Sequence, residues 1–300
     1  LALVEKEDLN AYYIFRELYM SSREFQSDPD VVFYLNVAEN RINERYFFID
    51  ETMELESFEN ANDVYFAHSY KDGSEDIVYF KGMTPVKDTG NSIQYLRDLT
   101  ITSIDGEGNL LRSMNVPYAK VLPVSVKTLT DTTKSLMGIE NNIDYVPYIM
   151  LKSVGREKPN TEVTPKYTFA NPEDDNMYSP DYVLLSIPYD DFLMIEEMPN
   201  EPAGMNIISL FKLIGKVSKY GYSAQIFGIA LMNRILYPLF LLVIFILLGV
   251  FAWNTRLGTN QYFKFSWIVA FPVFLVTAGV YYRACMFIYQ LINNILVMRF

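Results

Sequence analysis

The chain has 300 residues, half of them apolar, and a formal net charge of −11 at pH 7. All 36 acidic residues precede Met205, so residues 1–205 carry a net charge of −19 and residues 206–300 a charge of +8. This acidic first part argues against nucleic-acid binding, because it would repel phosphate. The single cysteine excludes an intrachain disulfide.

The sequence pattern of the first two thirds of the chain predicts an extramembrane domain. Residues 1–27 have a charged, helical pattern, and from residue 28 the pattern changes to short apolar or alternating runs that are typical of strands. Expected strands are residues 31–37, 46–49, 64–67, 77–80, 93–104, 110–116, 118–126, 145–151 and 182–187. The sequence Asp-Gly-Glu-Gly-Asn at residues 105–109 predicts a β-hairpin. Many short strands at this spacing predict an all-β, jelly-roll-like domain over residues 28–200.

Residues 201–300 form the predicted membrane region. Residues 235–253 carry no charge, and as a helix they would extend about 28 Å, close to the ~30 Å thickness of the hydrocarbon layer. Residues 265–298 would extend about 51 Å, too long for one span. We therefore expect a second span at 265–283 and a further partial helix at 284–298, with residues 206–233 forming an amphipathic helix before the spans. The predicted fold class is a membrane protein with an all-β extramembrane domain and a C-terminal α-helical transmembrane region.

The sequence offers little catalytic chemistry. His68 is the single histidine, and we interpret it as a surface or strand residue. Neighbouring residues on a strand face opposite sides, so adjacent carboxylates are expected on a solvated surface. These pairs are Asp174/Asp175, Asp190/Asp191 and Glu196/Glu197. The sequence also lacks a phosphate-binding loop. We predict that the chain is no enzyme and has no catalytic residue, no cofactor and no metal site.

Three segments in chain order resemble the lipopolysaccharide-export permease family. Residues 99–122 (LTITSIDGEGNLLRSMNVPYAKVL) are similar to the jelly-roll strands of that family. Residues 199–220, with Met205 and the following Gly221, are similar to the segment before its fourth membrane helix. Residues 231–249 (LMNRILYPLFLLVIFILLG) are similar to its pattern of Leu, Arg, Pro-Leu and a long apolar run that ends in Gly.

The resemblance implies a permease subunit of an ABC-type transporter that exports lipopolysaccharide or a related envelope lipid. The subunit would be a multi-pass protein of the inner (cytoplasmic) membrane, with the β domain in the periplasm and three further membrane helices before residue 1. The implied partners are the membrane lipid or lipopolysaccharide, a second homologous permease subunit, a cytoplasmic ATPase dimer and a periplasmic bridge protein that receives the lipid.

In such a permease, residues 265–282 would line the lateral gate through which lipid enters. Candidate lipid-contact residues are Arg283, Phe265, Phe271, Phe274, Tyr281 and Tyr282. The guanidinium of Arg283 would pair with a lipid phosphate, because its planar fork matches phosphate geometry. The alternative is that Arg283 is an interfacial anchor.

A second hypothesis for the whole chain stays open. A membrane-anchored envelope scaffold or sensor with a β-rich extracytoplasmic interaction domain explains the composition equally well. Three further hydrophobic spans before residue 1 would favour the permease, and a start codon just upstream would favour the anchored domain.

Overall fold

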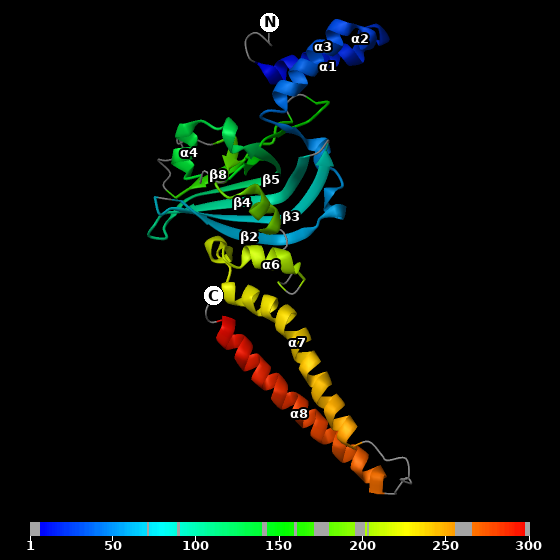
Figure 1. Cartoon of the computed structure of the whole chain (residues 1–300). Helices are drawn as coiled ribbons and strands as arrows, with labels where there is room; N and C mark the ends of the chain where they lie inside the picture. The colour runs from blue at the N-terminus through cyan, green and yellow to red at the C-terminus, as the bar shows by residue number, and fades with distance from the viewer. Residues whose placement is uncertain are drawn as a thin grey trace. The chain divides into compact units, whose positions relative to one another are not determined.

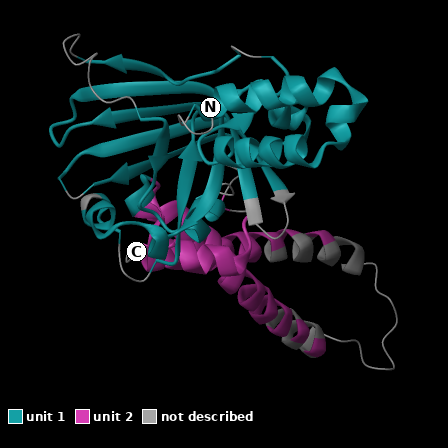
Figure 2. Ribbon diagram, turned by 90° about the horizontal axis from the view of Figure 1, so that it is seen from above, with its two compact units in different colours: residues 1–200, 219–221 teal, residues 201–218, 222–300 magenta. Residues whose placement is uncertain are grey.

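The computed structural model describes residues 7–70, 72–88, 91–139, 143–158, 161–170, 180–195, 202, 204–255 and 266–297. The chain divides into two compact units, residues 1–200 with 219–221 and residues 201–218 with 222–300, which Figure 2 colours separately. The first unit contains the β-sheet, and the second contains the long apolar helices.

Three helices open the first unit: α1 (Asp8–Ser21), α2 (Arg23–Ser27) and α3 (Pro29–Ile42). The strand expected at residues 31–37 is therefore wrong. The Asp28 carboxylate accepts hydrogen bonds from the backbone N–H groups of Asp30 and Val31, and Pro29 occupies the first turn, so α3 has both a cap and a preset start. The buried side chains of α3 recur at helical spacing: Val31, Leu35, Ala38 and Ile42.

Seven strands form one antiparallel sheet in the order β2-β3-β4-β5-β6-β9, with β8 also paired to β5 (Figure 1). Their bounds are β2 (Ala61–Ser69), β3 (Glu75–Asp88), β4 (Asn91–Ile104), β5 (Leu110–Ser125), β6 (Tyr145–Met150), β8 (Lys166–Phe169) and β9 (Tyr182–Leu184). A short parallel pair is separate from this sheet: β1 (Phe47–Phe48) and β7 (Ser153–Val154). The strands expected at 110–116 and 118–126 are one continuous strand, β5.

The first unit also contains α4 (Asp131–Met137) and α5 (Tyr189–Ile195). Phe192 of α5 packs against Phe66 of β2 and Phe80 of β3, so this helix completes the core at that end of the strand order. With five α-helices described in it, the unit is a mixed α and β structure. Helices α1 and α2 lie in residues 1–27, where a helical segment was expected, but α3, α4 and α5 lie within residues 28–200, so the expectation of an all-β domain there is wrong.

The predicted hairpin at residues 105–109 is confirmed as the turn between β4 and β5. One carboxylate oxygen of Asp105 accepts hydrogen bonds from the backbone N–H groups of Glu107 and Asn109, at 2.9 and 2.8 Å. Gly108 adopts φ +86°, a left-handed conformation that glycine tolerates without strain. This turn fixes the register of the two longest neighbouring strands.

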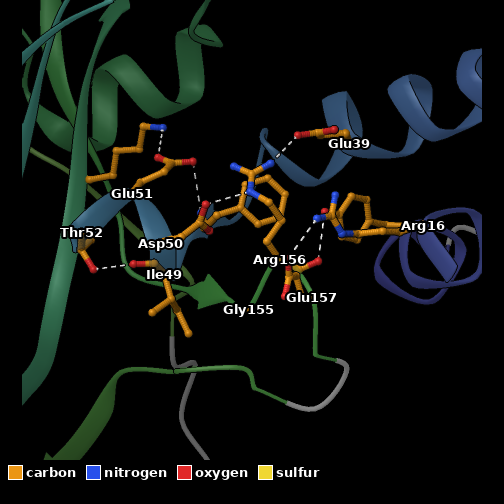
Figure 3. Close-up of polar contacts among 12 residues, drawn as sticks. Arg16, Glu39, Ile49, Asp50, Glu51, Thr52, Gly155, Arg156 and Glu157 are labelled. Carbon is orange, nitrogen blue, oxygen red and sulfur yellow. Dashed lines mark hydrogen bonds and ion pairs between the residues drawn. The ribbon is translucent and has the colours of Figure 1, made fainter. Parts of the chain in front are cut away.

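Arg156 connects the helices to the rest of the first unit (Figure 3). Its guanidinium lies 2.9 Å from the carboxylate of Glu39 on α3 and 2.8 Å from that of Asp50. The same group lies 3.9 Å from the ring centre of Phe48 on β1, a cation–π contact. The hydroxyl of Tyr12 on α1 donates to the backbone carbonyl of Arg156. One arginine thus contacts both long helices of this layer and β1.

The second unit contains α6 (Ile207–Leu213), α7 (Ala224–Thr255) and α8 (Ser266–Val297). The amphipathic helix expected at 206–233 is interrupted, because ten residues, 214–223, separate the end of α6 from the start of α7. Within the part of the chain that the structure describes, one stretch, Ala224–Ile246, has the length and composition to cross a membrane. The second expected span begins outside the described residues, and α8 continues through Arg283 without a turn.

Polar side chains join α7 to α8 in this unit. The side-chain oxygen of Asn233 accepts hydrogen bonds from the Tyr289 hydroxyl at 2.6 Å and from the Asn293 amide at 3.0 Å. A Cβ atom at Gly228 would lie 3.1 Å from Val297, so the absent side chain permits the close approach of the two helices. This end of the helix pair is held by both hydrogen bonds and close packing.

Candidate ligand-binding cavity

Four polar side chains lie directly opposite one another across β2, β3, β4 and β5. The strand register pairs His68 with Asp76, Asp76 with Ser103, and Ser103 with Arg112. Opposite residues of antiparallel strands point to the same face of a sheet. The register therefore forms a polar row, defined as His68, Asp76, Ser103 and Arg112, next to the turns that end these strands.

Asp76 is the centre of the polar row. Its carboxylate is buried, and its two oxygens accept hydrogen bonds from the hydroxyls of Tyr70 at 2.7 Å and Ser103 at 2.6 Å. These bonds compensate for the desolvation that a buried carboxylate suffers. Burial and the neighbouring Asp76 carboxylate raise the pKa of Tyr70 well above its ordinary value, so Tyr70 stays a neutral donor.

Arg112 ends the polar row and is half-buried. Its Nε lies 3.4 Å from the Ser103 hydroxyl, which in turn donates to Asp76. No carboxylate of the described residues lies within 4 Å of the Arg112 guanidinium. This guanidinium therefore keeps donors on its terminal nitrogens that the described part of the chain does not satisfy.

The polar row, from Asp76 onward, forms part of the wall of a cavity of about 560 Å³. Most other lining side chains are apolar or aromatic and come from five strands and the segment around α4: Ile101, Met114, Val124, Leu129, Met137, Tyr148, Tyr167, Tyr182 and Leu184. Three threonines, Thr128, Thr130 and Thr133, add hydroxyls near α4. A concave, mostly apolar space with a few converging polar groups is the usual form of a site for a small molecule or lipid.

His68 has a separate role beside this cavity. Its Nε2 lies 2.6 Å from the hydroxyl of Ser186, the residue that follows β9 by two positions. Burial lowers the pKa of His68, although the carboxylates of Asp76 and Glu75 act in the opposite direction. A serine–histidine pair can act as a nucleophile and base, but the two Asp76 oxygens bond to Tyr70 and Ser103 instead of the imidazole. The geometry is that of a structural link.

The structure describes the side chains of three of the candidate lipid-contact residues. Tyr281, Tyr282 and Arg283 are exposed and consecutive on α8, where successive side chains point about 100° apart. Phe265 lies outside the described residues, and of Phe271 and Phe274 only the backbone is described. Their roles stay predictions.

The sequence did not indicate the cavity, because its residues come from distant positions that only the strand register unites. The acidic pair Asp190/Asp191 also differs from its expected solvated position. Asp190 is exposed, but Asp191 is buried and accepts a hydrogen bond from the Tyr220 hydroxyl at 2.8 Å. Among the described residues, no group of three or more His, Cys, Asp or Glu side chains could hold a metal ion.

Comparison of the chain with protein-family models and with curated proteins finds no match.

Proposed function

We propose that this chain is the membrane-embedded permease subunit of an ABC-type transporter that exports lipopolysaccharide or a related envelope lipid, with the sheet domain receiving the lipid. The observation that carries the proposal is the cavity of about 560 Å³, which is mostly apolar and has polar groups at one end. A lipid has the same division into an apolar chain and a polar head. The volume lies within the range of about 300–1,000 Å³ that is usual for ligand sites.

Membrane attachment is supported by α7. Its Leu239, Leu242 and Phe245 side chains are all more than half exposed, and Phe245 reaches 72%. A long apolar surface of this kind is unfavourable in water and would be covered by hydrocarbon in a bilayer. The lack of any Asp or Glu from residue 206 onward supports the same proposal.

The remaining parts of the proposal follow from the family resemblance. The sheet domain would lie in the periplasm and correspond to the family's jelly roll, and both long helices would cross the inner membrane. A second homologous permease and a periplasmic bridge protein would complete the path of the lipid. Since the sequence has no phosphate-binding loop, a cytoplasmic ATPase dimer would hydrolyse the ATP.

Site-specific photo-crosslinking tests the proposal. A benzoylphenylalanine placed at Leu184, which lines the cavity, is expected to form adducts with lipid in membranes that contain the full chain. The matched control is Leu111, which is 45% exposed and does not line the cavity. Lipid adducts at position 184 and none at 111 support the proposal, and their absence at 184 contradicts it.

A membrane-anchored scaffold or sensor is the second candidate, and one observation favours it. Phe33 and Tyr34 of α3 are exposed, and Tyr34 stacks on Phe15 of α1 with ring centres 5.6 Å apart. Exposed aromatic side chains are enriched where proteins bind one another. Protein adducts from a crosslinker at Phe33, with no lipid adducts at Leu184, would favour this function.

A further inference from the structure

We infer that Arg112 makes the cavity selective for a lipid with an anionic headgroup, such as a phosphate ester, whose acyl chain occupies the apolar part. This inference deepens the proposed function and rests on it. It assigns the head of the lipid to the polar row and the tail to the space between β5, β6, β9 and α4.

The first argument is the unsatisfied charge of Arg112. A half-buried guanidinium in a mostly apolar cavity loses hydration, and a nearby anion compensates for this loss. Among the described residues no carboxylate lies within 4 Å of the Arg112 guanidinium, and Asp76 is linked to it only through the Ser103 hydroxyl. A phosphate oxygen pair fits the need, because the planar guanidinium donates two parallel hydrogen bonds to such a group.

The second argument concerns the neighbouring Asp76, whose negative charge would oppose an anion. Both of its oxygens already accept hydrogen bonds, one from Tyr70 and one from Ser103. Ser103 stands between Asp76 and Arg112 in the strand register and bonds to both. The hydroxyl therefore holds Nε of Arg112 toward the sheet and leaves the terminal nitrogens for a ligand.

The third argument concerns the source of the anion. Residues 1–205 carry a net charge of −19, so a free anion in solution is repelled from this domain at long range. An acyl chain that is buried in the apolar part of the cavity supplies binding energy that a free phosphate lacks. Met114 lies two residues from Arg112 on the same face of β5, so an apolar wall begins beside the guanidinium. We therefore assign the site to a lipid anion.

Photoreactive probes test this assignment on the full chain in phosphatidylcholine nanodiscs. The probes are dodecyl phosphate and dodecanol, each with a diazirine on the chain, and inorganic phosphate serves as a competitor. Arg112→Gln removes the charge, Arg112→Lys keeps it, and Arg45→Gln is the control, because Arg45 is exposed and outside the cavity. Thermal unfolding of each variant reports whether it folds as the wild type does.

The expected result is that dodecyl phosphate labels cavity residues of the wild type. Its affinity is expected to fall at least about tenfold in Arg112→Gln, as for the loss of a charged hydrogen bond. It is expected to recover only in part in Arg112→Lys, which keeps the charge but lacks the planar fork, and to stay unchanged in Arg45→Gln. Dodecanol is expected to label the cavity more weakly and equally in all variants.

Three results would overturn the inference. If both probes label the cavity equally in the wild type and in Arg112→Gln, the cavity binds lipid without recognising an anion, and the proposed function stands alone. If inorganic phosphate displaces dodecyl phosphate at equal concentration, the site recognises a free anion rather than a lipid. If neither probe labels the cavity, the proposed function fails together with the inference.

Discussion

The imidazole Nε2 of His68 lies 2.6 Å from the hydroxyl oxygen of Ser186. His68 belongs to β2, one edge of the seven-stranded sheet, and Ser186 follows β9, the opposite edge. The hydrogen bond thus links β2 to the segment that follows β9, so the sheet curls enough to bring Ser186 beside His68. The same curl encloses the core around Phe192.

This link predicts a pH dependence of stability. Burial lowers the pKa of His68 below 6.5, so the folded protein favours the neutral imidazole. The stabilising contribution is complete above pH 6.5 and is lost as the pH falls through the lower pKa of the folded state. Urea unfolding followed by far-UV circular dichroism between about pH 7.5 and about pH 5.5, above the usual carboxylate range, is expected to show this loss.

The matched variant is His68→Gln, which keeps a hydrogen-bonding side chain and removes the titration. Since the chain has a single histidine, the variant should show a flatter stability profile over this pH range than the wild type. Equal slopes for the two proteins would contradict the assigned role of His68.

The contacts of Arg156 are expected to contribute to the stability of the layer formed by α1 and α3. Arg156→Ala removes the ion pairs with Glu39 and Asp50 and the packing on Phe48. We expect a loss of about 1–2 kcal/mol in the free energy of unfolding, because partly exposed ion pairs and a cation–π contact each contribute modestly. Hydrogen exchange should accelerate in α1 and α3 first. Arg45→Ala is the exposed control, and an equal effect of both substitutions would refute this prediction.

The sequence predicted those parts of the fold that local chemistry determines. The hairpin at 105–109 was predictable because Asp105, Gly108 and Asn109 are turn residues at fixed positions. The run at 31–37 was misleading, since its valines suit a strand, whereas Asp28 and Pro29 start a helix and the buried positions recur every three or four residues. The capping residues and the packing of the helix outweigh the local β propensity.

The candidate cavity was beyond prediction for a different reason. Asp76, Ser103 and Arg112 are 27 and 9 residues apart in sequence and become neighbours only through the register of β3, β4 and β5. The periodicity of a single segment does not show which residues of two strands lie opposite each other, because register depends on the pairing between strands. In the same way, the sequence predicts a solvated position for Asp191, but in the structure the hydroxyl of Tyr220, 29 residues away, donates a hydrogen bond to it.

The contact between α7 and α8 predicts that a larger side chain at position 228 destabilises the helix pair. Gly228→Leu would place side-chain atoms where Val297 already lies, so we expect a loss of about 1–3 kcal/mol in the stability of the helix pair. Gly249→Leu is the matched control in the same helix, because a Cβ there meets nothing within 4 Å. The two tryptophans, at positions 253 and 267, lie in α7 and α8, so intrinsic fluorescence during unfolding in detergent can follow this unit. Equal stability of the two variants would contradict the close packing.

Substitution of Arg283 distinguishes two roles for this residue of α8. If its guanidinium binds a lipid phosphate, Arg283→Lys should lower lipid crosslinking measurably, by an energy of about 1–2 kcal/mol, because lysine lacks the planar fork. If Arg283 is an interfacial anchor, the lysine variant should behave as the wild type does. The measurement is crosslinking of lipid by the reconstituted protein, with Arg283→Ala beside Arg283→Lys. Normal crosslinking by both folded variants would dismiss Arg283 as a lipid ligand.

The central claim is that the cavity of the sheet domain holds a lipid, and the lipid content of the purified protein tests it most directly. Leu129→Trp places a larger side chain in the wall of the cavity, whereas Leu110→Trp changes an exposed residue outside it. Native mass spectrometry of the full chain is expected to show a bound lipid in the wild type and in Leu110→Trp, and a clear loss of it in Leu129→Trp. Equal lipid occupancy in all three proteins, each folded, would contradict the account.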